Sequence, residues 1–130
     1  MSWHKRGISS IEIFMVMIIM FGLMAIIMIA TLSAVNAAND AERKSNIAQF
    51  MKLIVASRIS NGTFPVENKE CNIGKDCYVL DQVLYSQKLD DIPQDPRGGD
   101  NYYKYQSDGH AFIIKCIMAN NSEYVYNSSN

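Results

Sequence analysis

A single carboxylate, Glu12, stands at the start of a long apolar segment and is the most unusual chemical group in the sequence. No charged residue occurs from Ile13 to Asn39. A helix over that range would be roughly 40 Å long, enough to cross a hydrocarbon core of about 30 Å. A carboxylate near the centre of a membrane costs roughly 2.5–3.5 kcal/mol, so we expect Glu12 to have a function and a charged partner. The alternative is an acid that snorkels to the interface of an ordinary signal anchor.

Three cysteines offer the chemistry of one disulfide and one free thiol. Cys71 and Cys77 flank a short loop in which Gly74 helps the chain to close. Cys116 falls on the apolar face of a predicted strand, which suits a buried free thiol. We favour a Cys71–Cys77 disulfide, and a bridge from Cys116 to either of the other two is the open alternative. A disulfide is typical of a domain in an oxidising compartment.

Catalytic chemistry finds little support in the sequence. No Gly-x-Ser-x-Gly, phosphate-binding loop or His-Glu-x-x-His is present. Metal ligation by cysteine is not expected, because no Cys-x-x-Cys occurs and His4 and His110 are remote from each other. The net charge of −1 gives no electrostatic case for nucleic acid as the main partner. We therefore expect a protein that is not an enzyme.

One long helix is predicted to position Glu12 and to support the rest of the chain. The helical pattern runs over 8–60 without Pro, and it ends at Asn61-Gly62 with Pro65 three residues on. Its first part, about 13–38, is apolar all round, as a lipid or protein surround requires. Its second part carries one predicted apolar stripe, formed by Ile47, Phe50, Met51, Ile54, Val55 and Ile59. The opposite, polar face is predicted to hold Arg43, Lys44, Asn46, Gln49, Lys52 and Ser57.

The C-terminal part, 61–130, is predicted to form a small sheet that covers this stripe. Val79–Lys88 can form a short helix, and Leu89–Gly99 is a loop rich in helix and strand breakers. The expected fold class is α+β, with one long helix packed on about three antiparallel strands. The strands are predicted at Tyr102–Gln106, His110–Ala119 and Tyr124–Tyr126.

The N-terminal residues resemble the class III signal of type IV pilins and of the pseudopilins of type II secretion. Lys5-Arg6-Gly7 ends a short basic leader, and Glu12 is the fifth residue after Gly7. The resemblance implies that a prepilin peptidase removes 1–7 by cutting after Gly7 and methylates the new N-terminus, Ile8. It also implies that Glu12 acts in filament assembly. This chain has Ile-Ser-Ser-Ile-Glu where the family usually has Phe-Thr-Leu-Ile-Glu, and Ile29 where many pilins have a kinking proline.

Two segments of the C-terminal part also resemble the secretion pseudopilins. Asn61-Gly62-Thr63-Phe64-Pro65 is similar to their Asn-Gly-x-Tyr-Pro signature, and Ile92-Pro93-Gln94-Asp95-Pro96-Arg97-Gly98-Gly99 is similar to their Leu-Pro-x-Asp-Pro-Trp-Gly loop. Arg97 stands where that family has Trp. The resemblance makes calcium a possible ligand of this region, because loop carboxylates suit Ca²⁺; the alternative is that they are turn residues. The calcium candidates are Asp95, Asp100 and Asp108.

The function implied is a structural subunit of a type IV filament, serving a pilus or a type II secretion pseudopilus. The implied partners are further copies of the chain, the prepilin peptidase, the assembly-platform membrane proteins, minor pilins and the membrane itself. The basic leader places the N-terminus in the cytoplasm and the C-terminal part outside, in a single-pass cytoplasmic (inner) membrane protein before assembly. The alternative is a solitary signal-anchored domain that binds a ligand at the cell surface.

Overall fold

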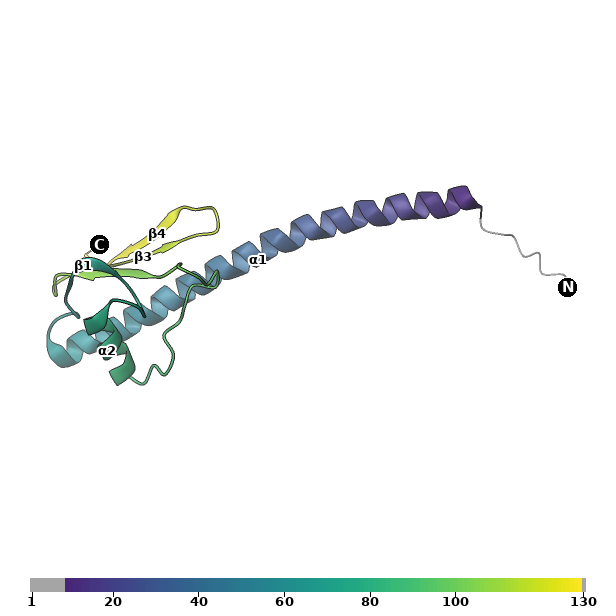
Figure 1. Cartoon of the computed structure of the whole chain (residues 1–130). Helices are drawn as coiled ribbons and strands as arrows, with labels where there is room; N and C mark the ends of the chain where they lie inside the picture. The colour runs from purple at the N-terminus through teal and green to yellow at the C-terminus, as the bar shows by residue number, and fades with distance from the viewer. Residues whose placement is uncertain (1–8, 130) are drawn as a thin grey trace. The chain divides into compact units, whose positions relative to one another are not determined.

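The computed structural model describes residues 9–129, and Figure 1 shows its helices and strands. The first helix, α1, spans Ser10–Asn61, and a short helix, α2, spans Tyr78–Ser86. The chain divides into two compact units at the boundary between Asn36 and Ala37, and α1 contributes to both.

The first unit is the apolar part of α1. Every large apolar side chain from Ile11 to Val35 is at least half exposed. α1 is the one helix among the described residues that is long and apolar enough to cross a membrane, and it lies near the N-terminus. A membrane anchor and a signal sequence both have this character. The predicted helix that is apolar all round is therefore present, and no part of the described chain covers it.

The second unit is an antiparallel sheet packed on the C-terminal part of α1. The sheet has four strands in the order β1-β2-β3-β4, one more than the approximate number of three that we predicted. The additional strand, β1, was not predicted because its sequence, Glu-Asn-Lys-Glu-Cys-Asn, shows no apolar alternation. The fold class is otherwise as predicted: α+β, with one long helix and a small antiparallel sheet. The strands are β1 Glu67–Asn72, β2 Lys104–Ser107, β3 Phe112–Ile117 and β4 Glu123–Asn127.

The face of α1 that contacts the sheet differs from the predicted stripe. Its buried residues recur at spacings of 4, 3, 4 and 3: Arg43, Ile47, Phe50, Ile54 and Ser57. Arg43 and Ser57, which we predicted on the polar face, are therefore buried. Val55 and Ile59, which we predicted in the stripe, are 45% and 84% exposed.

Aromatic side chains fill the core between α1 and the sheet. The rings of Phe50 in α1 and Tyr103 pack edge to face with their centres 5.4 Å apart. The rings of Phe64 and Phe112 of β3 pack in the same way with their centres 4.8 Å apart. Such pairs add about 0.5–1.5 kcal/mol beyond the area that they bury. Leu80 and Leu84 of α2 complete this core. Most of the chain from the end of α2 to β2 is loop, as predicted, and it follows the surface of the same unit.

Candidate functional site

Glu12 lies in the first turn of α1 with apolar neighbours. Ile13, Val16 and Met17 join it around a surface depression of about 360 Å³. A carboxylate in a first turn interacts favourably with the helix dipole. Within residues 9–129, no ion pair involves Glu12. Gly7 and Ile8, the predicted cleavage and methylation residues, lie outside the described residues.

The second unit contains a buried charged network centred on Arg43, which is 0% exposed. Its guanidinium donates two parallel hydrogen bonds to Asp95, at 2.8 Å from Nε and 2.9 Å from Nη2. The third nitrogen, Nη1, donates to Asp40 at 2.6 Å. Bidentate pairs of this kind are among the stronger hydrogen bonds in proteins.

The same carboxylates hold two other segments against α1. Asp40 accepts the N–H of Ala119 at 2.9 Å, and Asp95 accepts the N–H of Arg97 at 2.9 Å. The Arg97 guanidinium in turn donates to the carbonyl of Met118 at 2.7 Å. The loop before β2 and the turn after β3 are therefore fixed to the helix, and we call these residues, with Arg43, the Arg43 network.

The hydrogen bonds of this network keep Arg43 and Asp95 in their charged forms. Hydrogen bonds to Asp95 raise the pKa of Arg43 and outweigh the opposite effect of burial. Burial raises the pKa of Asp95, but the hydrogen bonds from Arg43 and from the Arg97 N–H outweigh it and hold that pKa below its usual range. Both groups therefore remain charged at neutral pH.

The calcium candidates are not brought together by the fold. Asp95 is 5% exposed and engaged by Arg43, so it serves as an internal counter-charge. Asp100 has a side chain that is 99% exposed and lies 4.0 Å from Lys75. Asp108 accepts the N–H groups of His110 and Ala111, both at 2.8 Å, as a turn residue does. Among residues 9–129 there is no group of three acidic, His or Cys side chains placed to hold a metal.

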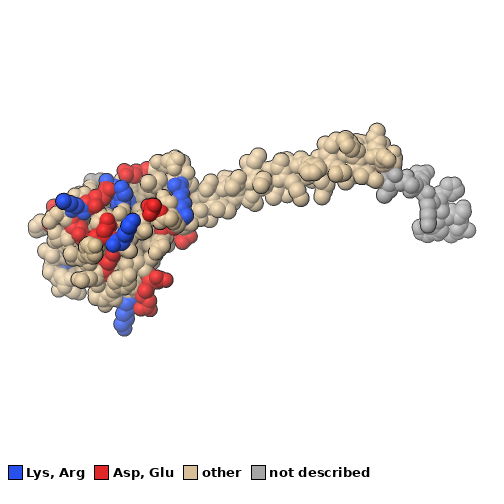
Figure 2. All heavy atoms as spheres, viewed as in Figure 1, with Lys and Arg blue, Asp and Glu red and all other residues tan. Residues whose placement is uncertain are grey.

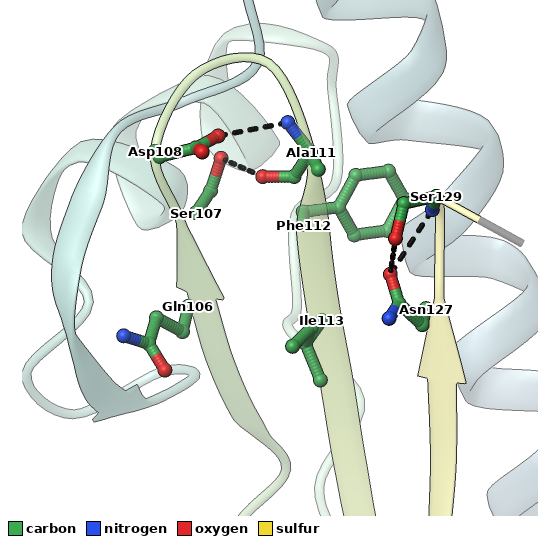
Figure 3. A pocket seen from close by; sticks show the side chains of 8 residues that line it. All are labelled: Gln106, Ser107, Asp108, Ala111, Phe112, Ile113, Asn127 and Ser129. Atoms are coloured by element: carbon green, nitrogen blue, oxygen red, sulfur yellow. Dashed lines mark hydrogen bonds between the residues drawn. The ribbon is translucent and has the colours of Figure 1, made fainter.

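Asp108 also lines a hollow of about 230 Å³ at the β2–β3 hairpin, together with Phe112, Ile113 and several polar residues (Figure 3). Its other polar side chains are also hydrogen-bonded: the hydroxyl of Ser107 donates to the carbonyl of Ala111 at 2.9 Å, and Asn127 accepts from Ser129. The side-chain amide of Gln106 donates to the carbonyl of Asn68 at 3.2 Å. The dashed lines in Figure 3 mark the bonds between the residues drawn there. The polar side chains around the hollow therefore already have hydrogen-bond partners within the protein, and few donors or acceptors are left free for a ligand.

The cysteines have the favoured arrangement: the structure joins Cys71 to Cys77 in a disulfide and leaves Cys116 free and buried. The disulfide closes the connection between β1 and α2. Cys116 faces the core of the sheet, where burial raises the pKa of its thiol to about 11. A thiol with so high a pKa is a poor nucleophile at neutral pH.

The surface charges of the second unit are mixed in sign. In the face shown in Figure 2, acidic and basic side chains alternate over the sheet and loops, and no single-sign field develops. On the outer face of the sheet, Glu70 pairs with Lys104 at 2.9 Å and with Lys115 at 3.0 Å. The face shown in Figure 2 therefore has no clustered basic region of the kind that phosphate binding needs.

Sequence reasoning missed the Arg43 network, because Arg43 was assigned to the solvent face. The only local signal is Asp40, three residues before Arg43, which is a spacing that favours an ion pair on a helix. The Arg43 network holds the second unit together, while Glu12 and the exposed apolar residues of α1 form the candidate assembly site.

Comparison with family models, with curated proteins and with solved structures finds no match to this chain.

Proposed function

We propose that this chain is a structural subunit of a type IV filament, either a pilin or a pseudopilin, assembled through the apolar part of α1. The observation that carries the proposal is that one helix has two successive surfaces. From Ile11 to Val35 its large apolar side chains are exposed, and from Arg43 to Ser57 one face packs on a folded unit. An apolar surface of this extent needs lipid or other protein around it.

Glu12 has a specific role in this proposal. In the membrane the carboxylate is near the end of the apolar segment, where it can reach the interface. In a filament the same group is surrounded by apolar helices, and a buried charge there needs a partner. After cleavage following Gly7, the amine of Ile8 on an adjacent subunit supplies the positive charge. The pair neutralises both groups and sets the axial position of neighbouring helices.

The second unit suits the position outside the cytoplasm that this role requires. Its Cys71–Cys77 disulfide fits an oxidising compartment. The basic residues Lys5 and Arg6 favour a cytoplasmic N-terminus. The proposed partners are further copies of the chain, the prepilin peptidase, the assembly-platform proteins and minor pilins. The proposed location is the cytoplasmic membrane and then a pilus or pseudopilus.

The first test is the mature N-terminus, measured by mass spectrometry of protein from filaments and from membranes. We expect the loss of Met1–Gly7 and one added methyl group on Ile8. An intact leader on filament-incorporated protein contradicts the proposal. The result also decides between the two classes of function, because the alternative, a solitary signal-anchored binding domain, does not need processing at Gly7.

The second test replaces Glu12 by Ala or Gln, with Glu42→Ala as the matched control. Glu42 is an exposed acid of α1 beyond the apolar segment. Glu12→Ala should leave membrane insertion intact, since a costly charge is removed, and should strongly reduce filament yield. Glu42→Ala should leave both unchanged. Wild-type filament yield from the Glu12 variant would show that Glu12 is only an interfacial acid.

A further inference from the structure

The sheet of the second unit has two edge strands, and they differ in how well they are protected. β1 shifts register between Glu67 and Cys71 and carries Glu67, Lys69 and Glu70. Irregular and charged edges discourage pairing with another strand. β4 keeps a regular register of five pairs with β3 and has a Tyr-Val-Tyr centre. β4 is therefore the open edge of this sheet.

The hydrogen bonds of β4 show which of its backbone groups are free. Met118 N–H donates to the carbonyl of Ser122 at 2.9 Å, and Ser128 N–H donates to the carbonyl of Phe112 at 3.0 Å. Hydrogen-bonded and non-bonded pairs alternate along an antiparallel ladder. With the register of β3 and β4, this alternation directs the N–H and C=O of Val125 away from β3. Val125 thus offers one donor and one acceptor at the edge.

A groove lies beside this edge, between β4 and α1. It has a volume of about 370 Å³ and is lined by Met51, Lys52, Val55, Ala56, Ile59 and Tyr126. Val55 and Ile59 are exposed although they are apolar. Figure 3 shows β4 as the outer strand beyond β3, with turns of a helix drawn next to it. The groove can receive apolar side chains that reach inward from a strand added to β4.

Two lysines give this side of α1 a positive charge. Lys52 lines the groove, and the Nζ atom of Lys44 lies 5.6 Å from the centre of the Tyr124 ring. Within residues 9–129 neither lysine makes an ion pair with an acid. Both lysines are exposed and available, so an occupant with an acidic side chain directed toward α1 can pair with one of them.

We propose that the β4 edge and the adjacent groove bind an extended acidic segment of a partner protein as a fifth strand. The segment pairs its backbone with Val125, places alternate apolar side chains in the groove and directs an acid toward Lys52 or Lys44. This inference does not depend on the proposed filament function, because all the groups that carry it belong to the second unit.

A second copy of β4 fits this edge less well than such a partner. The side chains of β4 that face α1 are Tyr124 and Tyr126, which carry no charge. The acid of β4, Glu123, lies on the other face of the strand, because side chains alternate along it. A copy paired through β4 would therefore leave both lysines without a counter-charge.

The test uses the full chain in detergent micelles and a fluorescent synthetic peptide, followed by fluorescence anisotropy. Every second residue of the peptide belongs to the face directed toward α1; these residues are valines and one glutamate, and the residues between them are serines. Two matched peptides serve as controls, one with lysine in place of glutamate and one acidic peptide with N-methylated alternate residues. We expect the lysine peptide to bind at least about tenfold more weakly and the N-methylated peptide not to bind. Equal binding of the acidic and lysine peptides, or no binding of the acidic peptide at millimolar concentration, overturns the proposal.

Variants then locate the site. Val125→Pro removes the outward N–H and leaves the bonds to β3, because proline is tolerated at the free side of an edge strand. Lys52→Glu reverses the groove charge, and Lys69→Glu makes the same charge change on β1. The first two should each weaken binding at least about tenfold, and Lys69→Glu should leave it unchanged.

Near-ultraviolet circular dichroism shows whether each variant folds. If Val125→Pro does not fold, Lys52→Glu alone tests the proposed binding site. Wild-type binding by a folded Lys52→Glu variant overturns the charge assignment, and wild-type binding by a folded Val125→Pro variant overturns the strand pairing. Self-association of the chain that Val125→Pro abolishes in the absence of peptide would assign the edge to a second copy and overturn the proposed partner.

Discussion

Replacing Asp95 by Asn should destabilise the second unit more than any surface ion-pair change. The asparagine side chain would keep the shape of the aspartate and remove its charge, so that Arg43 stays buried with only Asp40 as a counter-charge. The two side chains of the Arg43–Asp95 pair are 0% and 4% exposed. Removing one member of a buried pair typically costs 3–5 kcal/mol, because the other charge is left uncompensated. Since Asp40 keeps its 2.6 Å bond, we expect the lower end, about 3 kcal/mol.

The matched control is Glu70→Gln, which removes the acid of two ion pairs on the outer face of the sheet. Glu70 and its lysine partners are partly exposed, with side chains that are 36%, 42% and 29% accessible. Exposed pairs of this kind contribute up to about 1 kcal/mol each. A total stability of about 5–15 kcal/mol is usual for a domain, so only the Asp95 variant should lose a large share of it.

The assay is urea unfolding of the full chain in detergent, followed by the near-ultraviolet circular dichroism of Tyr103 and Tyr105, which are buried in the second unit. A double variant, Arg43→Met with Asp95→Asn, should lose less than the two single variants added together, because no buried charge is left unpaired. Equal losses for Asp95→Asn and Glu70→Gln, or strict additivity in the double variant, would refute the reasoning.

The Asp95→Asn variant should also differ from the wild type in how its stability depends on low pH. The pKa of Asp95 in the folded chain is held below its value in the unfolded chain. A depressed carboxyl pKa contributes stability that is present above the unfolded pKa of about 3.9 and is lost as the pH falls through the folded pKa. The wild type should therefore lose stability below about pH 4, and Asp95→Asn should lose less over the same range.

Three further predictions concern the cysteines and one turn. Cys77→Ser should lower stability by about 2 kcal/mol, because the disulfide closes a short loop with a sequence separation of 6, measured by urea unfolding against wild type. Iodoacetamide at pH 8 should label one thiol, Cys116, and only after unfolding, because burial raises the pKa of that thiol to about 11; mass spectrometry reports the count. Gly109→Ala should destabilise by about 1–2 kcal/mol, since Gly109 has φ +91° and a Cβ there would lie 3.1 Å from Val66; thermal melting checks this.

Features with a local cause could be predicted from the sequence. The apolar part of α1 is visible as an uninterrupted run of apolar residues in the sequence. The end of α1 at Asn61-Gly62 follows from turn chemistry: Gly62 has φ +81°, and its N–H donates to the carbonyl of Arg58 at 2.7 Å. The Cys71–Cys77 pairing also depends on a short loop. Each of these follows from residues that are close together in the sequence.

Features with a distant cause could not be predicted. Arg43 was assigned to solvent because a charge is rarely buried without a partner. Its partner, Asp95, lies 52 residues away in a loop without regular structure. β1 was missed for a related reason: its residues are polar, and its pairing is determined by β2, far along the chain. In both cases the deciding contact is tertiary, and local propensity gives no signal of it.

The Arg43 network has a consequence for how slowly the second unit unfolds. It joins helix residues to Asp95 and Ala119, across separations of 52 and 79 residues. Closing such long loops costs chain entropy before the contact stabilises the unit, so we expect these contacts to form after the folding transition state. Interactions that are absent from the folding transition state act mainly on the unfolding rate. The network should therefore lengthen the lifetime of the folded unit, which is the property that resists a brief mechanical pull or a protease.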